Sequence, residues 1–180
     1  FISWYLAREG HDVTEWGTEG NRSFEVLKNT GRNEYVELDP RIKLTGDLGE
    51  ALKVSDLIII SISSQGLRGF MSRVTEYPVK DKTFVLCMKG IEQDTGKRLS
   101  EIMRESGVDG DKIAVWVGPG HIQAFTQGKP NCMVIDSENE SLVKKLCDEL
   151  RSDLIRFYYG DDLIGSEIGA AAKNGIGIAA

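Results

Sequence analysis

Short, continuous apolar runs that alternate with helix-like segments constrain the fold of this chain most strongly. Three runs of strand length are Asp56–Ile62, Thr83–Met88 and Ala114–Val117. Leu67–Val74 and Lys97–Ser106 lie between them and carry apolar residues at helical spacing. Continuous apolar runs suit parallel strands that are covered on both faces, and strand–helix alternation is typical of a doubly wound sheet. The sequence therefore predicts an α/β fold with a doubly wound, mostly parallel sheet.

Further segments on both sides extend this pattern. Additional strands are expected over His11–Trp16, Arg41–Thr45, Asn131–Ile135 and Leu154–Tyr159. Additional helices are expected over Phe1–Glu9, Ser23–Asn29, Asp47–Val54, Glu138–Leu150 and from Ile164 to the end of the chain. The chain contains no internal repeat and no long linker.

Composition excludes several classes of partner. The 180 residues include 22 basic and 28 acidic side chains, which give a net charge of −6. A nucleic-acid partner is not expected, because phosphate contacts normally bring a basic excess. The apolar runs are far shorter than the about 20 residues of a membrane-spanning helix. The three cysteines are odd in number and lack metal-ligand spacing. We expect a cytoplasmic protein without membrane insertion and without a metal site.

Small and polar residues follow four of the expected strands. Ligands of open α/β sheets bind beyond the carboxyl ends of the strands. The segments at these ends are Trp16–Glu19, Ser61–Gly66, Met88–Gly90 and Gly118–His121. We expect them to line one crevice, with Ser63 and Ser64 among the residues that contact a cofactor.

A dinucleotide site also needs a Gly-rich turn between the first strand and the first helix, where backbone amides approach the pyrophosphate. No such turn follows a strand in this chain, so we expect it upstream of Phe1, in a Rossmann-like domain. The next strand normally ends at the adenosine ribose. Glu19 at this end would select NAD, whereas Thr18 and Arg22 would hold the 2′-phosphate of NADP. The residues favour NADP slightly over NAD.

The C-terminal segment carries a candidate acid/base residue. Asp161 and Asp162 suit the N-terminus of a helix, and several glycines in that helix indicate close packing against a backbone or a ligand. Lys173 lies among Ala and Gly residues, and desolvation would lower its pKa toward neutrality, as acid/base chemistry requires. Asn174 is placed to orient a carbonyl or a hydroxyl. The alternative is a surface lysine that snorkels to solvent.

These residues resemble those of the NAD(P)-dependent glycerol-3-phosphate dehydrogenases, and the Trp16–Glu19 and Ser63–Gly66 segments are most similar to archaeal members. The blocks that carry the resemblance are Ala7–Val13, Lys89–Glu92, Gly118–Pro119, Gly128–Pro130 and, most specifically, Asp162–Asn174. The resemblance implies hydride transfer between NAD(P)H and dihydroxyacetone phosphate, giving sn-glycerol 3-phosphate. It also implies a cofactor domain over residues 1–160, followed over residues 161–180 by the first helix of an all-α substrate domain.

The resemblance implies a role for individual residues. Lys173 matches the catalytic lysine, which polarises the carbonyl and passes a proton to the developing alkoxide. Lys89 matches a lysine near both substrate and nicotinamide. The other matches are Gly118 and Gly120 at substrate contacts made through the backbone, Ile122 at a position that lines the cofactor, and Thr18 beside the adenosine ribose. By this reading Lys173, Lys89 and Asn174 form the catalytic set.

The chain also departs from the family pattern. Gly120 stands where many members have Ser or Thr, which removes a hydroxyl contact to substrate. Ile122 replaces a common Ala, Ser63 a frequent Pro, and Gly175 a β-branched residue. A different dehydrogenase of the same architecture, such as a ketopantoate reductase, is one alternative. A non-catalytic nucleotide-sensing module is another.

The two ends of the chain also carry an expectation. It begins at Phe1 rather than Met and ends at Ala180 within an apolar, Gly/Ala-rich run. We expect a fragment without the Gly-rich turn and without most of the substrate domain, and therefore without activity by itself. Measurable reduction of dihydroxyacetone phosphate by these 180 residues would contradict this expectation. The sequence leaves the oligomeric state open, a homodimer included.

Overall fold

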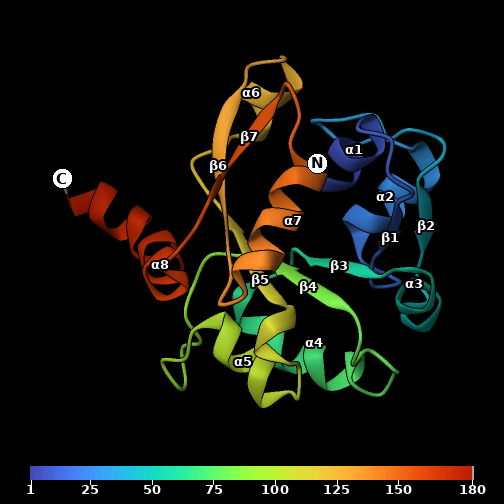
Figure 1. Cartoon of the computed structure of the whole chain (residues 1–180). Helices are drawn as coiled ribbons and strands as arrows, with labels where there is room; N and C mark the ends of the chain where they lie inside the picture. The colour runs from blue at the N-terminus through green and yellow to red at the C-terminus, as the bar shows by residue number, and fades with distance from the viewer. Residues whose placement is uncertain (180) are drawn as a thin grey trace.

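The computed structural model describes residues 1–179, apart from the side chains of Asn174 and Ala179 and the exposure of Gly175. Strands and helices alternate along the chain (Figure 1). A five-stranded sheet contains, in spatial order, β3 (Leu57–Ile60), β4 (Thr83–Leu86), β5 (Ile113–Val117), β6 (Asn131–Asp136) and β7 (Ile155–Tyr159). All neighbouring pairs in it are parallel except β5 and β6, which are antiparallel. The predicted α/β, Rossmann-like fold with a mostly parallel sheet is confirmed.

The two faces of this sheet bury separate apolar cores, because successive side chains of a strand point to opposite faces. In β5, Ile113, Val115 and Val117 belong to one core, whereas Ala114 and Trp116 belong to the other. Such a strand is apolar throughout, as the continuous runs in the sequence predict.

Helices cover both faces of the sheet. The first core packs against α3 (Leu48–Val54), α4 (Leu67–Val74) and α5 (Leu99–Glu105). The second packs against α1 (Ile2–Arg8) and α7 (Glu140–Leu150). The hydroxyl of Tyr5 in α1 donates a hydrogen bond to the Leu150 carbonyl at 2.5 Å, which joins these two helices.

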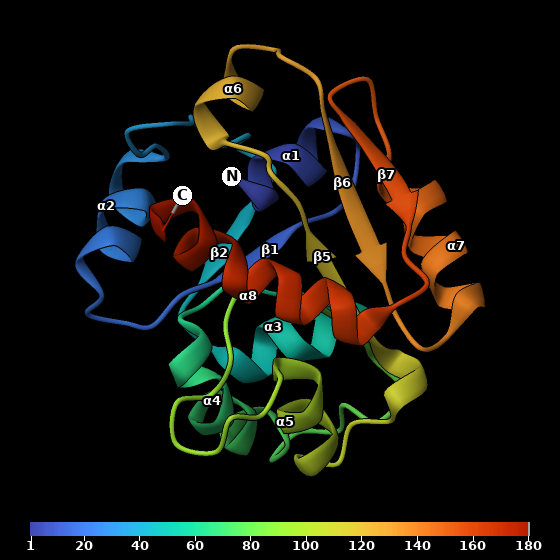
Figure 2. The same ribbon diagram turned by 90° about the vertical axis from the view of Figure 1, so that its left-hand side faces the viewer.

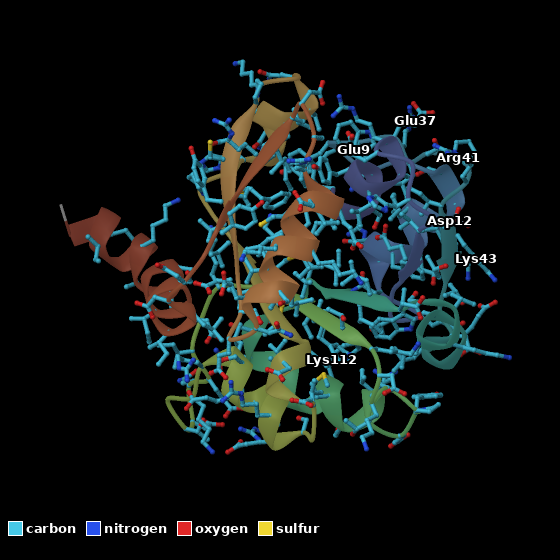
Figure 3. The ribbon with its side chains drawn as sticks, viewed as in Figure 1. Glu9, Asp12, Glu37, Arg41, Lys43 and Lys112 are labelled. Atoms are coloured by element: carbon cyan, nitrogen blue, oxygen red, sulfur yellow. The ribbon has the colours of Figure 1, made fainter. Side chains whose placement is uncertain are left out.

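A second, smaller sheet contains β1 (Thr14–Trp16) and β2 (Lys43–Thr45), which are parallel. It packs with α2 (Arg22–Thr30) around a third, smaller core. Figure 3 shows Arg41 and Lys43 on this side of the molecule, away from the C-terminal helix.

The C-terminal helix α8 (Leu163–Ala179) lies beside β5 (Figure 2). Each predicted helix and strand is present, and most strands are shorter than expected because their outer residues do not join the ladders. The short helix α6 (Ile122–Thr126) was not predicted. No helix in the described part of the chain is long and apolar enough to cross a membrane.

Candidate active site

A cavity of about 220 Å³ lies between helix α8 and the loops that follow β4 and β5. It is lined by Lys89, Val117, Gly118, Pro119, Ser166, Gly169, Ala170 and Lys173. Val117 ends β5, so the cavity lies at the carboxyl end of the parallel strands, where open α/β sheets bind ligands. Among residues 1–179 we find no group of His, Cys, Asp and Glu residues that is arranged to hold a metal ion.

The turn after β5 depends on a glycine. Gly118 has a φ of +154°, a conformation that side chains disfavour, and a Cβ there would lie 2.8 Å from the Met133 sulfur. This turn presents the Gly118 carbonyl to Lys89, whose Nζ donates a hydrogen bond to it at 3.2 Å. The backbone of the turn thereby fixes the position of one ammonium group at the cavity.

Lys89 and Lys173 interact electrostatically across the cavity. Desolvation by the surrounding protein, and then the positive charge of Lys173, lower the pKa of Lys89 below its ordinary value. The sequence left two alternatives for Lys173, a desolvated lysine and a surface lysine, and the structure places its side chain in an exposed position, as the second alternative expects. Two ammonium groups at one cavity create a positive potential, which favours an anion or negative charge that develops during a reaction.

Ion pairs fix the loop that carries Lys89. The Arg68 guanidinium donates hydrogen bonds from Nε and Nη2 to the two Glu92 carboxylate oxygens, each at 2.8 Å. These bonds, with one from Thr95, hold the pKa of Glu92 at about 2. The Gln65 amide adds a second connection, because it donates to the Ile91 carbonyl at 2.9 Å. The loop is therefore held by charge-assisted hydrogen bonds close to Lys89.

Helix α8 is fastened to the start of α5 by a buried carboxylate. Glu167 is 6% exposed and accepts hydrogen bonds from the Ser100 backbone N–H at 2.9 Å and the Ser100 hydroxyl at 2.6 Å. It also accepts one from Arg98 at 2.8 Å. Since Lys173 lies on the same helix, these bonds set where its ammonium can reach.

The structure brings together part of the predicted set. Lys89, Gly118 and Lys173 line one cavity, and Gly120 lies against Met133, as Gly118 does. Lys89 is the one predicted cofactor residue that lines it. The other four do not: Thr18 follows β1, Ser63 and Ser64 follow β3, and Ile122 begins α6. Asn174 lies within α8, but its side chain is outside the described part of the chain.

Sequence reasoning missed the three residues that α8 adds to the cavity wall beside Lys173. Ser166, Gly169 and Ala170 precede Lys173 by seven, four and three residues, so all four share one face of α8. This spacing was the available signal. The several glycines of α8 need no common explanation, since a Cβ at Gly169 or Gly177 would meet no atom within 4 Å.

A mostly parallel α/β sheet with a cavity at the carboxyl ends of its strands places this chain in the Rossmann-like class of domains. A family model described as the N-terminus of NAD-dependent glycerol-3-phosphate dehydrogenase matches residues 1–143. The chain belongs to this glycerol-3-phosphate dehydrogenase family.

Individual relatives agree with this assignment. The chain is 32% identical to a glycerol-3-phosphate dehydrogenase [NAD(P)+] of Staphylococcus haemolyticus, over 97% of the chain and 54% of that relative. A crystal structure of glycerol-3-phosphate dehydrogenase from Coxiella burnetii matches with a TM-score of 0.88 at 25% identity, over 99% of the chain and 55% of that structure. The chain thus spans about half the length of these relatives. A D-mandelate dehydrogenase matches over 97% of the chain and 57% of its own, with a TM-score of 0.68 at 17% identity, a likeness of fold alone.

Proposed function

We propose that this chain supplies the cofactor side and the catalytic lysines of an NAD(P)-dependent glycerol-3-phosphate dehydrogenase. Such an enzyme interconverts dihydroxyacetone phosphate and sn-glycerol 3-phosphate by hydride transfer. One observation carries the proposal: Lys89, Lys173 and the Gly118 carbonyl converge on one cavity at the carboxyl end of β5. Membership of the family supports the class of reaction.

Lys173 is the proposed proton donor. Its ammonium, placed over the substrate carbonyl oxygen, stabilises the negative charge that grows during reduction and then transfers a proton to the alkoxide. Lys89 adds a second positive charge, which the Gly118 carbonyl holds in place. Because the pKa of Lys89 is lowered, this charge is lost at a lower pH than that of an ordinary lysine. Substrate affinity should therefore decline correspondingly early as the pH rises.

Three further residues are assigned to the substrate in this proposal. Gly118 and Gly120 contact the substrate through their backbone, which suits the tight turn after β5. Asn174 orients the substrate carbonyl or hydroxyl from the position next to Lys173.

The loops at the carboxyl edge fit a dinucleotide. NAD(P)H, when bound, supplies the hydride that reduces the carbonyl carbon. Thr18, Ser63 and Ile122 are exposed, and Ser64 is half-buried, so these side chains remain free to contact such a cofactor. We assign Thr18 to the adenosine ribose and the other three to the cofactor surface between the ribose and the nicotinamide.

NADP is the proposed preferred cofactor. Arg22 begins α2 four residues after Thr18, and both side chains are exposed. The side chain of Glu19 lies against Gly46, since a Cβ on that glycine would come within 2.5 Å of it. This placement supports a basic and hydroxyl environment for a 2′-phosphate, with the carboxylate directed toward the end of β2.

The proposal also covers the domain boundaries, the cellular location and the oligomeric state. Residues 1–160 form the cofactor domain, and residues 161–180 begin the helical substrate domain. We place the enzyme in the cytoplasm, as a homodimer with no nucleic-acid partner.

The test uses the complete gene product, assayed with NADH and NADPH against dihydroxyacetone phosphate and, separately, ketopantoate. Only dihydroxyacetone phosphate should be reduced, and NADPH should give the higher kcat/KM. Lys173→Ala should lower kcat by about 10²- to 10⁴-fold, the usual contribution of a positioned acid. Lys145→Ala, which removes an exposed lysine of α7 on the other side of the sheet, is the matched control and should retain activity.

Two results would contradict the proposal. Absence of dihydroxyacetone phosphate reduction with either cofactor would exclude the reaction. Full activity of Lys173→Ala would leave the reaction in place and remove the assigned proton donor.

A further inference from the structure

Ser166 occupies a position on the cavity wall that the proposed mechanism does not use. It lies on α8 seven residues before Lys173, on the same face of the helix. Its hydroxyl donates a hydrogen bond to Oδ2 of Asp136 at 2.7 Å. A polar side chain in this cavity is therefore tied to a carboxylate behind it.

Asp136 is an unusual residue for the end of a strand. It is the last residue of β6, has no exposed surface, and its Oδ1 has no hydrogen-bond partner among the described residues. Burying a carboxylate that is only partly hydrogen-bonded costs stability. A buried polar group with such a cost calls for a functional explanation.

The surrounding backbone leaves room for this carboxylate. A Cβ on Gly160 would lie 2.3 Å from Cγ of Asp136, so a side chain at position 160 would displace it. Gly160 is itself held by a hydrogen bond from its N–H to the Ile135 carbonyl at 2.8 Å. Gly160 thus leaves the space in which the Asp136 carboxylate accepts the hydrogen bond from Ser166.

The hydrogen bond to Asp136 decides what Ser166 presents to a ligand. A serine hydroxyl has one proton and two lone pairs, and an ionised carboxylate can only accept. With its proton directed to Asp136, Ser166 presents only lone pairs to the cavity. It is thereby prepared to accept a hydrogen bond from a hydroxyl group of a ligand.

The position of Ser166 suits the hydroxymethyl group of the proposed substrate. Seven residues of α-helix advance about 10 Å along the axis, and helical side chains lean toward the N-terminus. The ammonium of Lys173 therefore leans toward Ser166. This spacing is compatible with a substrate whose carbonyl lies at Lys173 and whose neighbouring hydroxyl is directed toward Ser166.

We propose that Ser166 binds the substrate hydroxyl next to the reacting carbonyl, and that Asp136 is the positioning residue that fixes its proton. The pair would make the site selective for hydroxyketone phosphates over ketone phosphates that lack the hydroxyl. This inference rests on the proposed function and adds a specificity determinant to it.

The test compares two substrates of the complete gene product: dihydroxyacetone phosphate and 2-oxopropyl phosphate, in which hydrogen replaces that hydroxyl. Ser166→Ala should lower kcat/KM for the first about 5- to 10-fold more than for the second, which is the effect of one hydrogen bond. Ser166→Thr keeps the hydroxyl and should keep the preference. Calorimetric dissociation constants for both compounds provide the same comparison without turnover.

Asp136→Ala tests the positioning role. Asp136→Ala should reduce the ratio of the two kcat/KM values. The double variant with Ser166→Ala should reduce this ratio little further, because the two residues act as one unit. A purely structural effect would lower kcat/KM by the same factor for both compounds. Ser137→Ala is the matched control: this buried serine donates to the Ile113 carbonyl at 2.6 Å and does not line the cavity, so the preference should not change.

The outcomes separate the two proposals. Turnover of dihydroxyacetone phosphate with an unchanged preference in Ser166→Ala would overturn the role of Ser166 alone. Absence of turnover in the unmodified protein would contradict the proposed function, while the ratio of the two dissociation constants would still decide whether Ser166 recognises the hydroxyl. If Asp136→Ala fails to fold, Ser166→Ala and Ser166→Thr still decide whether Ser166 recognises the substrate hydroxyl.

Discussion

Lys89 and Lys173 share one cavity, so each ammonium belongs to the electrostatic environment of the other. Their side chains come from a loop and a helix that are 84 residues apart in sequence. Desolvation and the charge of Lys173 act in the same direction on Lys89, and both lower its pKa. Two cations held together without an acidic partner in the cavity lining favour an anionic ligand between them.

Removing the charge of Lys173 should raise the pKa of Lys89. In Lys173→Gln the repulsion is gone, while desolvation still holds the pKa below that of an ordinary lysine. The measurement is an NMR titration of the Lys89 Nζ environment in both proteins. Lys112→Gln is the control, because Lys112 directly precedes β5 at the opposite edge of the sheet. An unchanged titration of Lys89 in Lys173→Gln would mean that the two side chains do not interact.

The sequence identified residues by chemistry and by family likeness, and it missed those that depend on tertiary neighbours. Lys89 and Lys173 belong to recognisable motifs, and the structure places both at one cavity. The helical spacing from Lys173 was the available signal for Ser166, but its hydrogen bond to Asp136, which is 30 residues away on another element, has no signal in the sequence. The exposure of Lys173 agrees with the alternative of a surface lysine, since apolar neighbours along a helix do not lie over the lysine itself.

Helix α8 is the element on which the candidate site depends most. Two neighbouring residues attach it at different points: Ser166 to the end of β6 and Glu167 to the start of α5. Helix periodicity predicts that such neighbours point in different directions. The helix is therefore held against two elements, and the orientation of its cavity face is fixed.

Loss of the Glu167 attachment should destabilise the protein strongly. Glu167→Ala removes the acceptor of the Ser100 hydroxyl proton and of the Ser100 backbone N–H, and it breaks a 2.8 Å contact with Arg98, whose side chain is only 15% exposed. Breaking a buried, hydrogen-bonded charge pair costs about 3 kcal/mol or more. The free energy of unfolding in urea measures this loss.

Glu149→Ala provides the matched control for that measurement. Its carboxylate is 48% exposed and lies 3.8 Å from Lys145 on α7, so its removal should change the free energy of unfolding very little. Equal effects of the two substitutions would show that Glu167 does not fasten α8.

Element prediction succeeded where periodicity and apolar runs were strong. Leu67–Val74 is a helix over the predicted residues, and β4 and β5 lie within a few residues of their predicted ends. Helix α6 was missed because five residues contain too few turns for a periodic signal. The antiparallel direction of β6 was not predicted either, since apolar patterning alone does not give the direction of a strand.

On the scale of the whole molecule, the strands form two sheets that differ in the number of neighbouring strands and in the burial of their side chains. The inner strand β4 pairs on both sides, and Phe84, Val85 and Leu86 have no exposed surface. In contrast, β1 and β2 have three residues each and pair only with one another within the described chain. Composition and apolar patterning predict the fold class. They do not predict that the strands separate into two sheets, because that depends on which strands become neighbours.

The smaller sheet should open more readily than the central one. Local opening has a low free energy where few backbone hydrogen bonds are buried and the supporting core is small. We expect amide hydrogens in peptides covering residues 14–45 to exchange at least about 10-fold faster than those covering residues 83–86 and 113–117. Hydrogen exchange followed by mass spectrometry measures both regions in one sample. Equal protection would show that the two sheets open as one unit, and the adenosine side of the proposed cofactor site would then be as rigid as the lysine cavity.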